Sequence, residues 1–211
     1  MKITKFGHSC LLVEENGVRI LVDPGVYSTA QNELKNIDAV LITHEHQDHV
    51  DIASLKTVLG NNAGARVITN GSVADIFVKE GIKVDLVEDG ASTDVKGVTI
   101  EGVGKEHALI HSSVPRIKNV GYFIAGRFFY PGDALTIPGR PVEILAMPTA
   151  APWGKVSEFL DYAIAVKPKV CFPVHDAILK DPAFGNRWPS LVLPPAGISF
   201  QILELGKEYE F

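Results

Sequence analysis

The chain has 211 residues, of which 46% are hydrophobic and 21% charged, and its mean hydropathy is +0.14. This composition is too apolar for a disordered protein and is ordinary for a compact soluble protein with a substantial core. Acidic residues outnumber basic ones by 25 to 20, and the formal net charge is −5. No general cationic field is therefore available to hold a phosphate backbone, which argues against nucleic acid as a partner.

Targeting and redox signals point to an ordinary intracellular protein. No apolar run reaches the roughly 18 residues of a membrane span, and the start MKITKFGHSC lacks the apolar core of a signal peptide. We therefore expect a cytoplasmic protein with no membrane partner. Cys10 and Cys171 lie in apolar stretches without a C-x-x-C pair, which predicts buried free thiols. Without a long linker or an evident repeat, we expect one domain over residues 1–211.

The N-terminal half is predicted to alternate short strands with helices. Strands are expected over 3–6, 10–14 and 18–22, the last two joined by the hairpin signal Asn16-Gly17. A near-continuous apolar strand follows over 38–43, and Asp51 can cap a helix that stops at Gly60. The order then continues as strand 65–69, helix 72–79, strand 83–87 and strand 98–104.

The C-terminal half keeps the same α/β rhythm. The runs GYFIAG and RFFYPGD predict a hairpin that turns at Gly126. A strand over 142–148 precedes an amphipathic helix over 155–166, which Pro168 ends. A buried strand over 169–174, a loop over 182–190 and a closing strand with alternating faces over 198–205 complete the chain.

The most informative motif is H-E-H-Q-D-H, residues 44–49, which directly follows the buried strand 38–43. Imidazole and carboxylate groups suit zinc, iron or manganese, and a loop at a strand end can turn alternate side chains toward one point. Alternation places His44 and His46 together and turns Asp48 and His49 elsewhere. One short loop can thus begin two neighbouring metal sites that distant segments complete.

This motif, preceded by LVDPG and followed by a Gly-Asp and an isolated His after strands, resembles the metallo-β-lactamase superfamily. The opening FGHSCLLVEENGVRILVDPG is similar to its compact, single-domain branch of metal-dependent hydrolases, which includes L-ascorbate-6-phosphate lactonase-like proteins. The resemblance implies an α/β fold, namely a four-layer αββα sandwich of two mixed β-sheets with the metals at one edge.

The same resemblance implies roles for the motif and for one downstream carboxylate. His44 and His46 would hold a first metal ion, and Asp48 and His49 a second. Asp133, in FFYPGDAL, matches the Gly-Asp whose carboxylate bridges both ions.

The remaining ligands come from two later segments. His175 matches the late histidine at a strand end and would complete the second metal site. For the third ligand of the first metal, EGVGKEHALIHSS offers both His107 and His111. His107 is favoured because it follows a strand and GVGK, as in the family, which leaves His111 as an alternative ligand or a residue facing the substrate.

The sequence predicts the roles of three further residues less strongly. Asp23 is expected to accept a hydrogen bond from a ligating imidazole, with a simple turn-capping role as the alternative. His8 resembles the histidine of the family's G-H-S start, near the site, and an ordinary core or loop histidine is the equal alternative. Trp153 is expected to pack as a buried aromatic rather than to wall the pocket.

The predicted chemistry is hydrolysis. Two divalent metal ions, with zinc the first choice and manganese, iron or nickel as alternatives, would lower the pKa of a bridging water from 15.7 toward about 7. The bridging hydroxide would attack a small ester, lactone or phosphoester, and Asp48 would orient it or pass its proton to the leaving group. The chain contains no G-x-S-x-G, Walker loop or G-x-G-x-x-G motif to support a different enzyme class.

Several alternatives stay open: a phosphodiesterase or nuclease of the same superfamily, a di-iron redox protein, and a scaffold without catalysis. Substrate specificity is expected to depend on the loops 25–36, 111–119 and 134–140. Their basic residues Arg116, Lys118 and Arg140 could meet an anionic small-molecule substrate, although solvated surface charge is the favoured interpretation. The oligomeric state is open.

Overall fold

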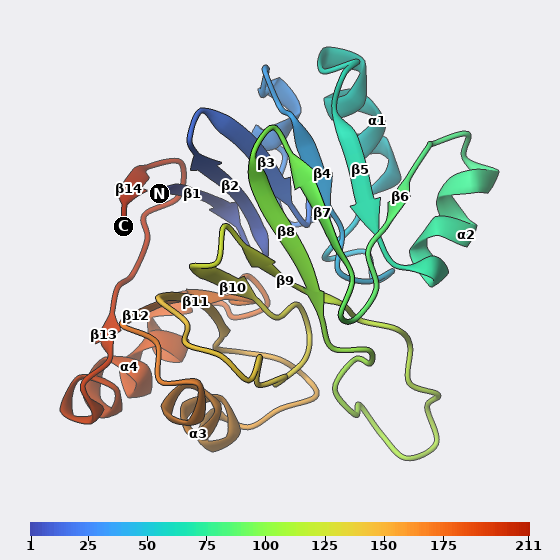
Figure 1. Ribbon diagram of the computed structural model, residues 1–211. Coiled ribbons are helices and arrows are strands. Elements are labelled where there is room, and N and C mark those ends of the chain that lie inside the picture. Colours follow the sequence, from blue (N-terminus) through green and yellow to red (C-terminus); the bar gives the residue numbers. More distant parts are fainter.

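The computed structural model describes residues 1–211 as two β-sheets that face each other, with helices on their outer surfaces (Figure 1). The first sheet has the strand order β14-β1-β2-β3-β4-β5-β6 and the second has the order β13-β12-β11-β10-β9-β8-β7. Each sheet is antiparallel in one half and parallel in the other, with β3 and β10 at the junctions. The predicted four-layer αββα sandwich of two mixed sheets is confirmed.

The elements have the following bounds. The first sheet contains β1 (Lys2–Gly7), β2 (Cys10–Glu15), β3 (Val18–Val22), β4 (Ala39–Leu41), β5 (Arg66–Thr69), β6 (Asp85–Leu86) and β14 (Glu208–Glu210). The second contains β7 (Ser92–Val95), β8 (Val98–Val103), β9 (Gly121–Ile124), β10 (Phe128–Tyr130), β11 (Ile144–Pro148), β12 (Val170–Val174) and β13 (Ser199–Phe200). The helices are α1 (Ile52–Asn61), α2 (Gly71–Lys79), α3 (Val156–Val166) and α4 (Pro182–Val192), with short 3₁₀ turns η1 (Ala30–Glu33) and η2 (Pro194–Ala196).

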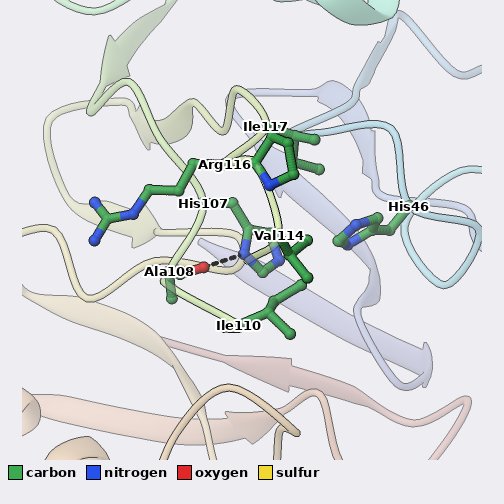
Figure 2. A pocket seen from close by; sticks show the side chains of 8 residues that line it. His46, His107, Ala108, Ile110, Val114, Arg116 and Ile117 are labelled. Carbon is green, nitrogen blue, oxygen red and sulfur yellow. Dashed lines mark hydrogen bonds between the residues drawn. The ribbon is translucent and has the colours of Figure 1, made fainter. Parts of the chain in front are cut away.

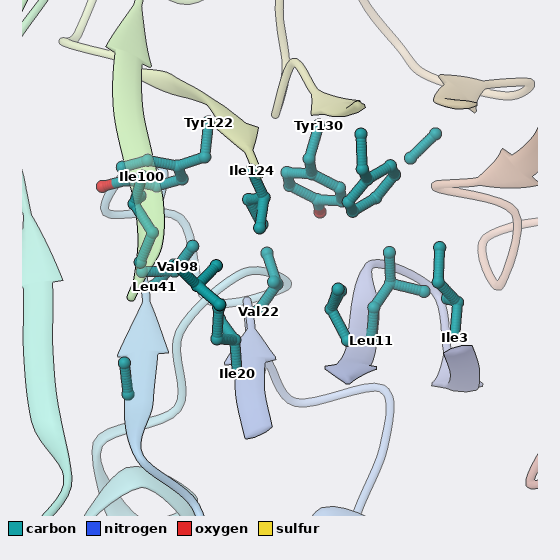
Figure 3. Packing of buried hydrophobic residues seen from close by; sticks show 14 of the residues in the cluster. Ile3, Leu11, Ile20, Val22, Leu41, Val98, Ile100, Tyr122, Ile124 and Tyr130 are labelled. Carbon is teal, nitrogen blue, oxygen red and sulfur yellow. The ribbon is translucent and has the colours of Figure 1, made fainter. Parts of the chain in front are cut away.

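The alternation of side chains along the strands builds three layers of core. In β2, Leu11 and Val13 point into the central cluster between the sheets, whereas Cys10 and Leu12 pack on the opposite face with α1 and α2. Figure 3 shows Leu11 of the first sheet facing Tyr130 of the second. A third cluster joins the outer face of the second sheet to α3. The sandwich is thus held together by apolar burial on both faces of each sheet.

Most expected elements are present with small shifts at their ends. Asp51 caps α1 by accepting hydrogen bonds from the backbone N–H groups of Ala53 and Ser54, and the helix ends one residue beyond Gly60. The hairpin β9–β10 turns at Gly126, as predicted. The strand expected over 83–87 is reduced to β6, and β7 was not anticipated.

The prediction of a loop over 182–190 is wrong, because this segment forms α4. Its two prolines and one glycine suggested irregular structure, but Pro182 occupies the first helical turn, where a backbone N–H has no helical partner anyway. Asp181 caps the helix by accepting from the N–H of Ala183 at 2.9 Å. Pro189 interrupts the helical hydrogen bonds but is buried against the body of the protein.

The closing strand expected over 198–205 is also wrong in extent. Only β13 pairs with β12, through Ser199 and Phe200. The chain then crosses to the first sheet, where β14 pairs antiparallel with β1. Leu203 in the crossing segment is buried between the sheets, so the alternating pattern reflects burial during a crossover rather than one continuous strand.

Two simpler predictions can also be compared with the structure. Cys10 and Cys171 are free and buried, and burial raises the pKa of each thiol to about 12. None of the helices is both long and apolar enough to cross a membrane.

Candidate metal centre

The predicted site residues follow the ends of strands from both sheets. His8 lies in the β1–β2 turn, Asp23 follows β3, His44, His46, Asp48 and His49 follow β4, His107 follows β8, Asp133 follows β10 and His175 follows β12. The close approach of these segments gathers side chains that are far apart in the sequence.

The loop after β4 folds into a tight turn. The backbone N–H groups of His49 and Val50 both donate to the carbonyl of His46 at 3.0 Å. Gly25 packs directly against this turn: a Cβ atom at Gly25 would lie 2.0 Å from the carbonyl oxygen of Asp48. The glycine of the Asp-Pro-Gly segment is therefore required for the turn to take its place.

The site consists of two adjoining clusters. Within each, the possible ligand atoms lie within 4.8 Å of one another. The first cluster contains His44, His46, His107 and Asp133, and the second contains His8, Asp48, His49 and His175.

Asp133 lies between the two clusters. Its Oδ2 is 3.3 Å from His107 Nε2 in the first cluster and 3.0 Å from His175 Nε2 in the second. Its Oδ1 is 3.0 Å from His49 Nε2. This is the placement that a carboxylate shared by two cations needs.

Backbone and side-chain acceptors orient the imidazoles. His107 Nδ1 donates to the carbonyl of Ala108 at 2.7 Å, and His175 Nδ1 donates to the carbonyl of Ala150 at 2.6 Å. His44 Nδ1 lies 3.0 Å from Thr43 Oγ1. With a proton held on Nδ1, the neutral form of each ring has its lone pair on Nε2, which is directed into the site.

These inward atoms lack hydrogen-bond partners. The Nε2 atoms of His44, His107 and His175 and the Oδ1 atom of Asp133 are buried and accept no hydrogen bond. Leaving one buried polar atom unpaired costs about 1–3 kcal/mol, so four such atoms in two adjoining clusters carry a large penalty without a binding partner. A bound divalent cation removes that penalty, and the donor set of imidazole and carboxylate fits zinc, iron or manganese.

The ionisation of His44 and Asp133 suits metal binding. Burial, together with the neighbouring His49, holds the pKa of His44 well below its usual range, so its ring is neutral. Burial opposes ionisation of Asp133, yet the surrounding imidazoles hold the pKa of its carboxyl well below its usual range. A neutral imidazole and an ionised carboxylate are the forms that bind metals.

Asp23 contacts the clusters from behind. This fully buried carboxylate accepts from the backbone N–H of Thr43 at 2.8 Å, from Thr43 Oγ1 at 2.7 Å and from His49 Nδ1 at 2.7 Å. The hydrogen bond to His49 is of the kind that the sequence predicts. It leaves His49 Nε2 directed toward Asp133.

His8 occupies the second cluster in a different protonation form. The backbone N–H of Ala177 donates to His8 Nδ1 at 3.2 Å, so the proton of a neutral His8 ring must be on Nε2. That Nε2–H lies 3.2 Å from Asp48 Oδ2, to which it donates. His8 therefore supports Asp48 instead of offering a lone pair to a cation.

His111 and Trp153 differ from the other predicted residues. His111 is exposed, bonds to Ser113 and belongs to neither cluster. Trp153 packs edge-on against Phe159, but it is only half-buried and also lines a cavity beside His107, which is the role that the sequence analysis did not favour. Its Nε1–H donates to Asp133 Oδ2 at 2.8 Å. No local pattern around Trp153 indicates this second contact, because it depends on how two distant loops meet.

Sequence reasoning missed one further contact beside the site. Lys5 of β1 is buried with 2% of its side chain exposed, and its Nζ donates to both carboxylate oxygens of Asp176 at 2.7 and 2.8 Å. Burial lowers the pKa of Lys5 although Asp176 opposes the shift. The strand also contains Lys2 and Thr4, so the residue types of β1 gave no signal that Lys5 is buried. The pair fixes the backbone next to His175.

Comparison with known proteins agrees with this fold. The model of the Beta-lactamase superfamily domain matches residues 2–175. Protein Rv0786c of Mycobacterium tuberculosis is 40% identical over 190 residues, which cover 88% of each chain. A UPF0173 metal-dependent hydrolase of Aeropyrum pernix is 30% identical, with 100% of this chain and 97% of the relative covered. Igni18, a metallo hydrolase from Ignicoccus hospitalis, has the same fold, with a TM-score of 0.79 and 23% identity over 100% of this chain and 98% of that chain.

The chain therefore belongs to the metallo-β-lactamase superfamily and, within it, to the UPF0173 family of metal-dependent hydrolases. It is a metal-dependent hydrolase with two His/Asp clusters able to bind metal.

Proposed function

We propose that the protein hydrolyses a small ester, lactone or phosphoester with two divalent metal ions, zinc in the first instance. The observation that carries this proposal is the set of buried, unpaired ligand atoms that converge from both clusters. The first ion is assigned to His44, His46 and His107. The second is assigned to Asp48, His49 and His175, and Asp133 is assigned to both.

A divalent ion held by these residues would supply hydroxide at neutral pH by lowering the pKa of water toward about 7, and it would polarise the oxygen of the scissile group. The residues of this chain position the reactants. Asp48 is the carboxylate with access to substrate, because 24% of its side chain is exposed and it lines a cavity of about 480 Å³. It takes the proton of the attacking water and passes it to the leaving oxygen, and His8 holds it in place.

Metal content provides the first test. We expect elemental analysis of protein purified without added metal or an affinity tag to give about two equivalents per chain. His46→Ala and Asp133→Ala should each lower this content while circular dichroism shows an intact fold. His111→Ala is the matched control, since this histidine lies outside both clusters, and it should retain the metal.

Activity is then measured on the metal-loaded protein with one neutral ester, one lactone and one phosphodiester. Hydrolysis that falls at least about 100-fold in His46→Ala would support the proposal. Failure to take up zinc, manganese or iron after reconstitution would overturn it.

A further inference from the structure

The cavities next to Asp48 and His175 point to the kind of substrate that this site accepts. The first, which we call the entrance cavity, has a volume of about 480 Å³ and is lined by Val26, Tyr27, Gln47, Pro152 and Ile178 together with those two residues. Asp48 and His175 supply its only ionisable groups other than the Tyr27 phenol. A substrate that reaches the metal clusters from this side meets a mixed wall, apolar at Val26, Pro152 and Ile178, that contains no lysine or arginine.

A second cavity continues the first. This apolar groove of about 290 Å³ lies between the loop 149–154 and the starts of α3 and α4, and it shares Pro152 and Ile178 with the entrance cavity. Val156, Phe159 and Phe184 form much of its remaining wall. Its lining contains no charged side chain. The volume is near the lower end of the range of about 300–1,000 Å³ for small-molecule sites, which suits a chain or a single ring.

The groove is tied directly to the metal centre. The carbonyl of Ala150, which lines the groove, accepts the hydrogen bond that orients His175, at 2.6 Å. Phe184 is 71% exposed and Ile178 is 42% exposed along the same path. Large apolar side chains left in water beside a site are typical of a surface that binds an apolar ligand.

The basic residues of the neighbouring loops are already paired with carboxylates. Arg116 Nη1 lies 3.1 Å from Glu106, Lys118 Nζ lies 3.1 Å from Glu88, and Arg140 Nη1 lies 2.9 Å from a carboxylate oxygen of Glu101. Figure 2 shows that Arg116 lines a separate small cavity with His46 and His107, and that its guanidinium is turned away from His46. None of these three cations lines the entrance cavity or the groove.

Two other lysines are near the groove in the sequence but not in its wall. Lys155 and Lys180 adjoin lining residues, yet neither lines either cavity. A phosphate or carboxylate on the part of the substrate that lies in the entrance cavity or the groove would therefore be desolvated without a cationic partner, which costs free energy.

We infer that the substrate is a small neutral carboxylic ester or lactone whose apolar chain lies in the groove while its carbonyl faces the metal clusters. This inference rests on the proposed hydrolysis and narrows its substrate class. In the reaction, the acyl C–O bond breaks. The oxygen and one proton of water go to the new acid, and the other proton goes to the leaving alcohol.

The kinetic test uses 4-nitrophenyl acetate, 4-nitrophenyl octanoate and the mono-4-nitrophenyl ester of octanedioic acid, which carries a carboxylate at the far end of the chain. We expect kcat/KM for the octanoate to exceed that for the acetate by at least about tenfold, since each methylene buried in an apolar pocket increases selectivity. The charged half-ester should react no faster than the acetate. Equal rates for acetate and octanoate, or a preference for the charged half-ester, would overturn the inference while leaving the hydrolase proposal intact.

Two groove variants and a control locate the effect. Phe184→Ser and Val156→Asn should each remove most of the preference for octanoate over acetate. Val78→Asn, which changes an exposed apolar residue of α2, should keep the preference. Loss of the preference in Val78→Asn alone would contradict the assignment to the groove.

A binding measurement separates this inference from the reaction itself. Titration calorimetry on the metal-loaded protein compares octan-2-one, butan-2-one and 7-oxooctanoate, none of which is an ester. Tighter binding of octan-2-one, with a negative heat-capacity change that is lost in Phe184→Ser, would support the apolar site even if no ester were hydrolysed. Equal affinities for octan-2-one and butan-2-one, or a higher affinity for 7-oxooctanoate than for octan-2-one, would overturn the inference.

Discussion

Among the individual residues, the ones that hold the imidazoles matter as much as the imidazoles themselves. Asp23 and the carbonyls of Ala108 and Ala150 each bind an Nδ1–H, so the opposite nitrogen of each ring has one possible direction. Partners of this kind fix the protonation form of a ligating histidine and raise its basicity. The geometry of the clusters is therefore built before any metal arrives.

Asp23→Asn tests this orientation. We expect metal affinity to fall about 10–100-fold, because an amide cannot accept from Thr43 and His49 as the carboxylate does. Asn tolerates the left-handed backbone at this position, where φ is +44°, so the fold should persist. A competition titration with a chelator measures the change. Asp38→Asn is the control, because Asp38 bonds to the backbone of Arg19 near the start of β3, whereas Asp23 follows the end of that strand. An affinity within twofold of wild type in Asp23→Asn would refute the prediction.

Trp153→Phe tests the hydrogen bond from the indole to Asp133. The ring would still pack against Phe159, but a hydrogen bond to a charged acceptor, worth about 1.5–3 kcal/mol, would be lost. We expect metal affinity or kcat/KM to fall by roughly tenfold or more. Trp188→Phe on α4 controls for loss of an indole elsewhere. If Trp153→Phe and Trp188→Phe change metal affinity and kcat/KM to the same extent, the hydrogen bond to Asp133 does not contribute to either.

Among the elements, β1 and the end of β12 are joined by the buried pair of Lys5 and Asp176. Lys5→Met leaves the Asp176 carboxylate buried without its partner, and breaking a buried pair in this way costs about 3–5 kcal/mol. We expect urea unfolding to show a loss of this size. The double variant Lys5→Met/Asp176→Leu should be more stable than the single one, because no buried charge remains. A loss below about 1 kcal/mol in Lys5→Met would show that the pair contributes little.

The elements also show how far local patterns predict a fold. Helix α1 was readable because its cap Asp51 and its apolar period lie within one segment. Helix α4 was not, because Pro182 and Pro189 signal a loop locally and only burial against the body of the protein compensates. The segment 198–205 alternates like a strand, yet it leaves one sheet for the other after Phe200. Local signals do not report such a crossover.

For the whole molecule, the metal centre joins the two sheets. The first sheet contributes the loop after β4, and the second contributes His107, Asp133 and His175. The backbone N–H of Ala108 donates to the carbonyl of Asp133, which couples two of these segments directly. The clusters therefore exist only when the sheets are packed together, so metal binding stabilises the entire fold.

The metal-free protein should be most stable near pH 6.5. Burial lowers the pKa of His8, His44 and His46, so below about 6.5 the unfolded chain binds more protons and stability rises with pH. Carboxylate neighbours outweigh burial at His49 and His175, raising the pKa of His175 to about 9. Their contribution is full below about 6.5 and is lost as the pH rises through the folded pKa.

Urea unfolding in the presence of a chelator at pH 5, 6.5 and 8.5 measures this profile. We expect the free energy of unfolding to be roughly 1–3 kcal/mol higher at pH 6.5 than at either extreme. A profile that rises steadily from pH 5 to 8.5 would contradict the raised pKa values of His49 and His175.

The sequence by itself determined the α/β class, the metallo-β-lactamase resemblance and the motif at 44–49, because these depend on the order and spacing of residues along short segments. It also indicated Asp133 and His175 through their positions after strands. Only the tertiary structure placed His107 in a cluster and His111 outside it, paired Trp153 with Asp133 and buried Lys5 against Asp176. These contacts join segments up to 171 residues apart. Their distances follow from the packing of one sheet on the other, which no single stretch of sequence encodes.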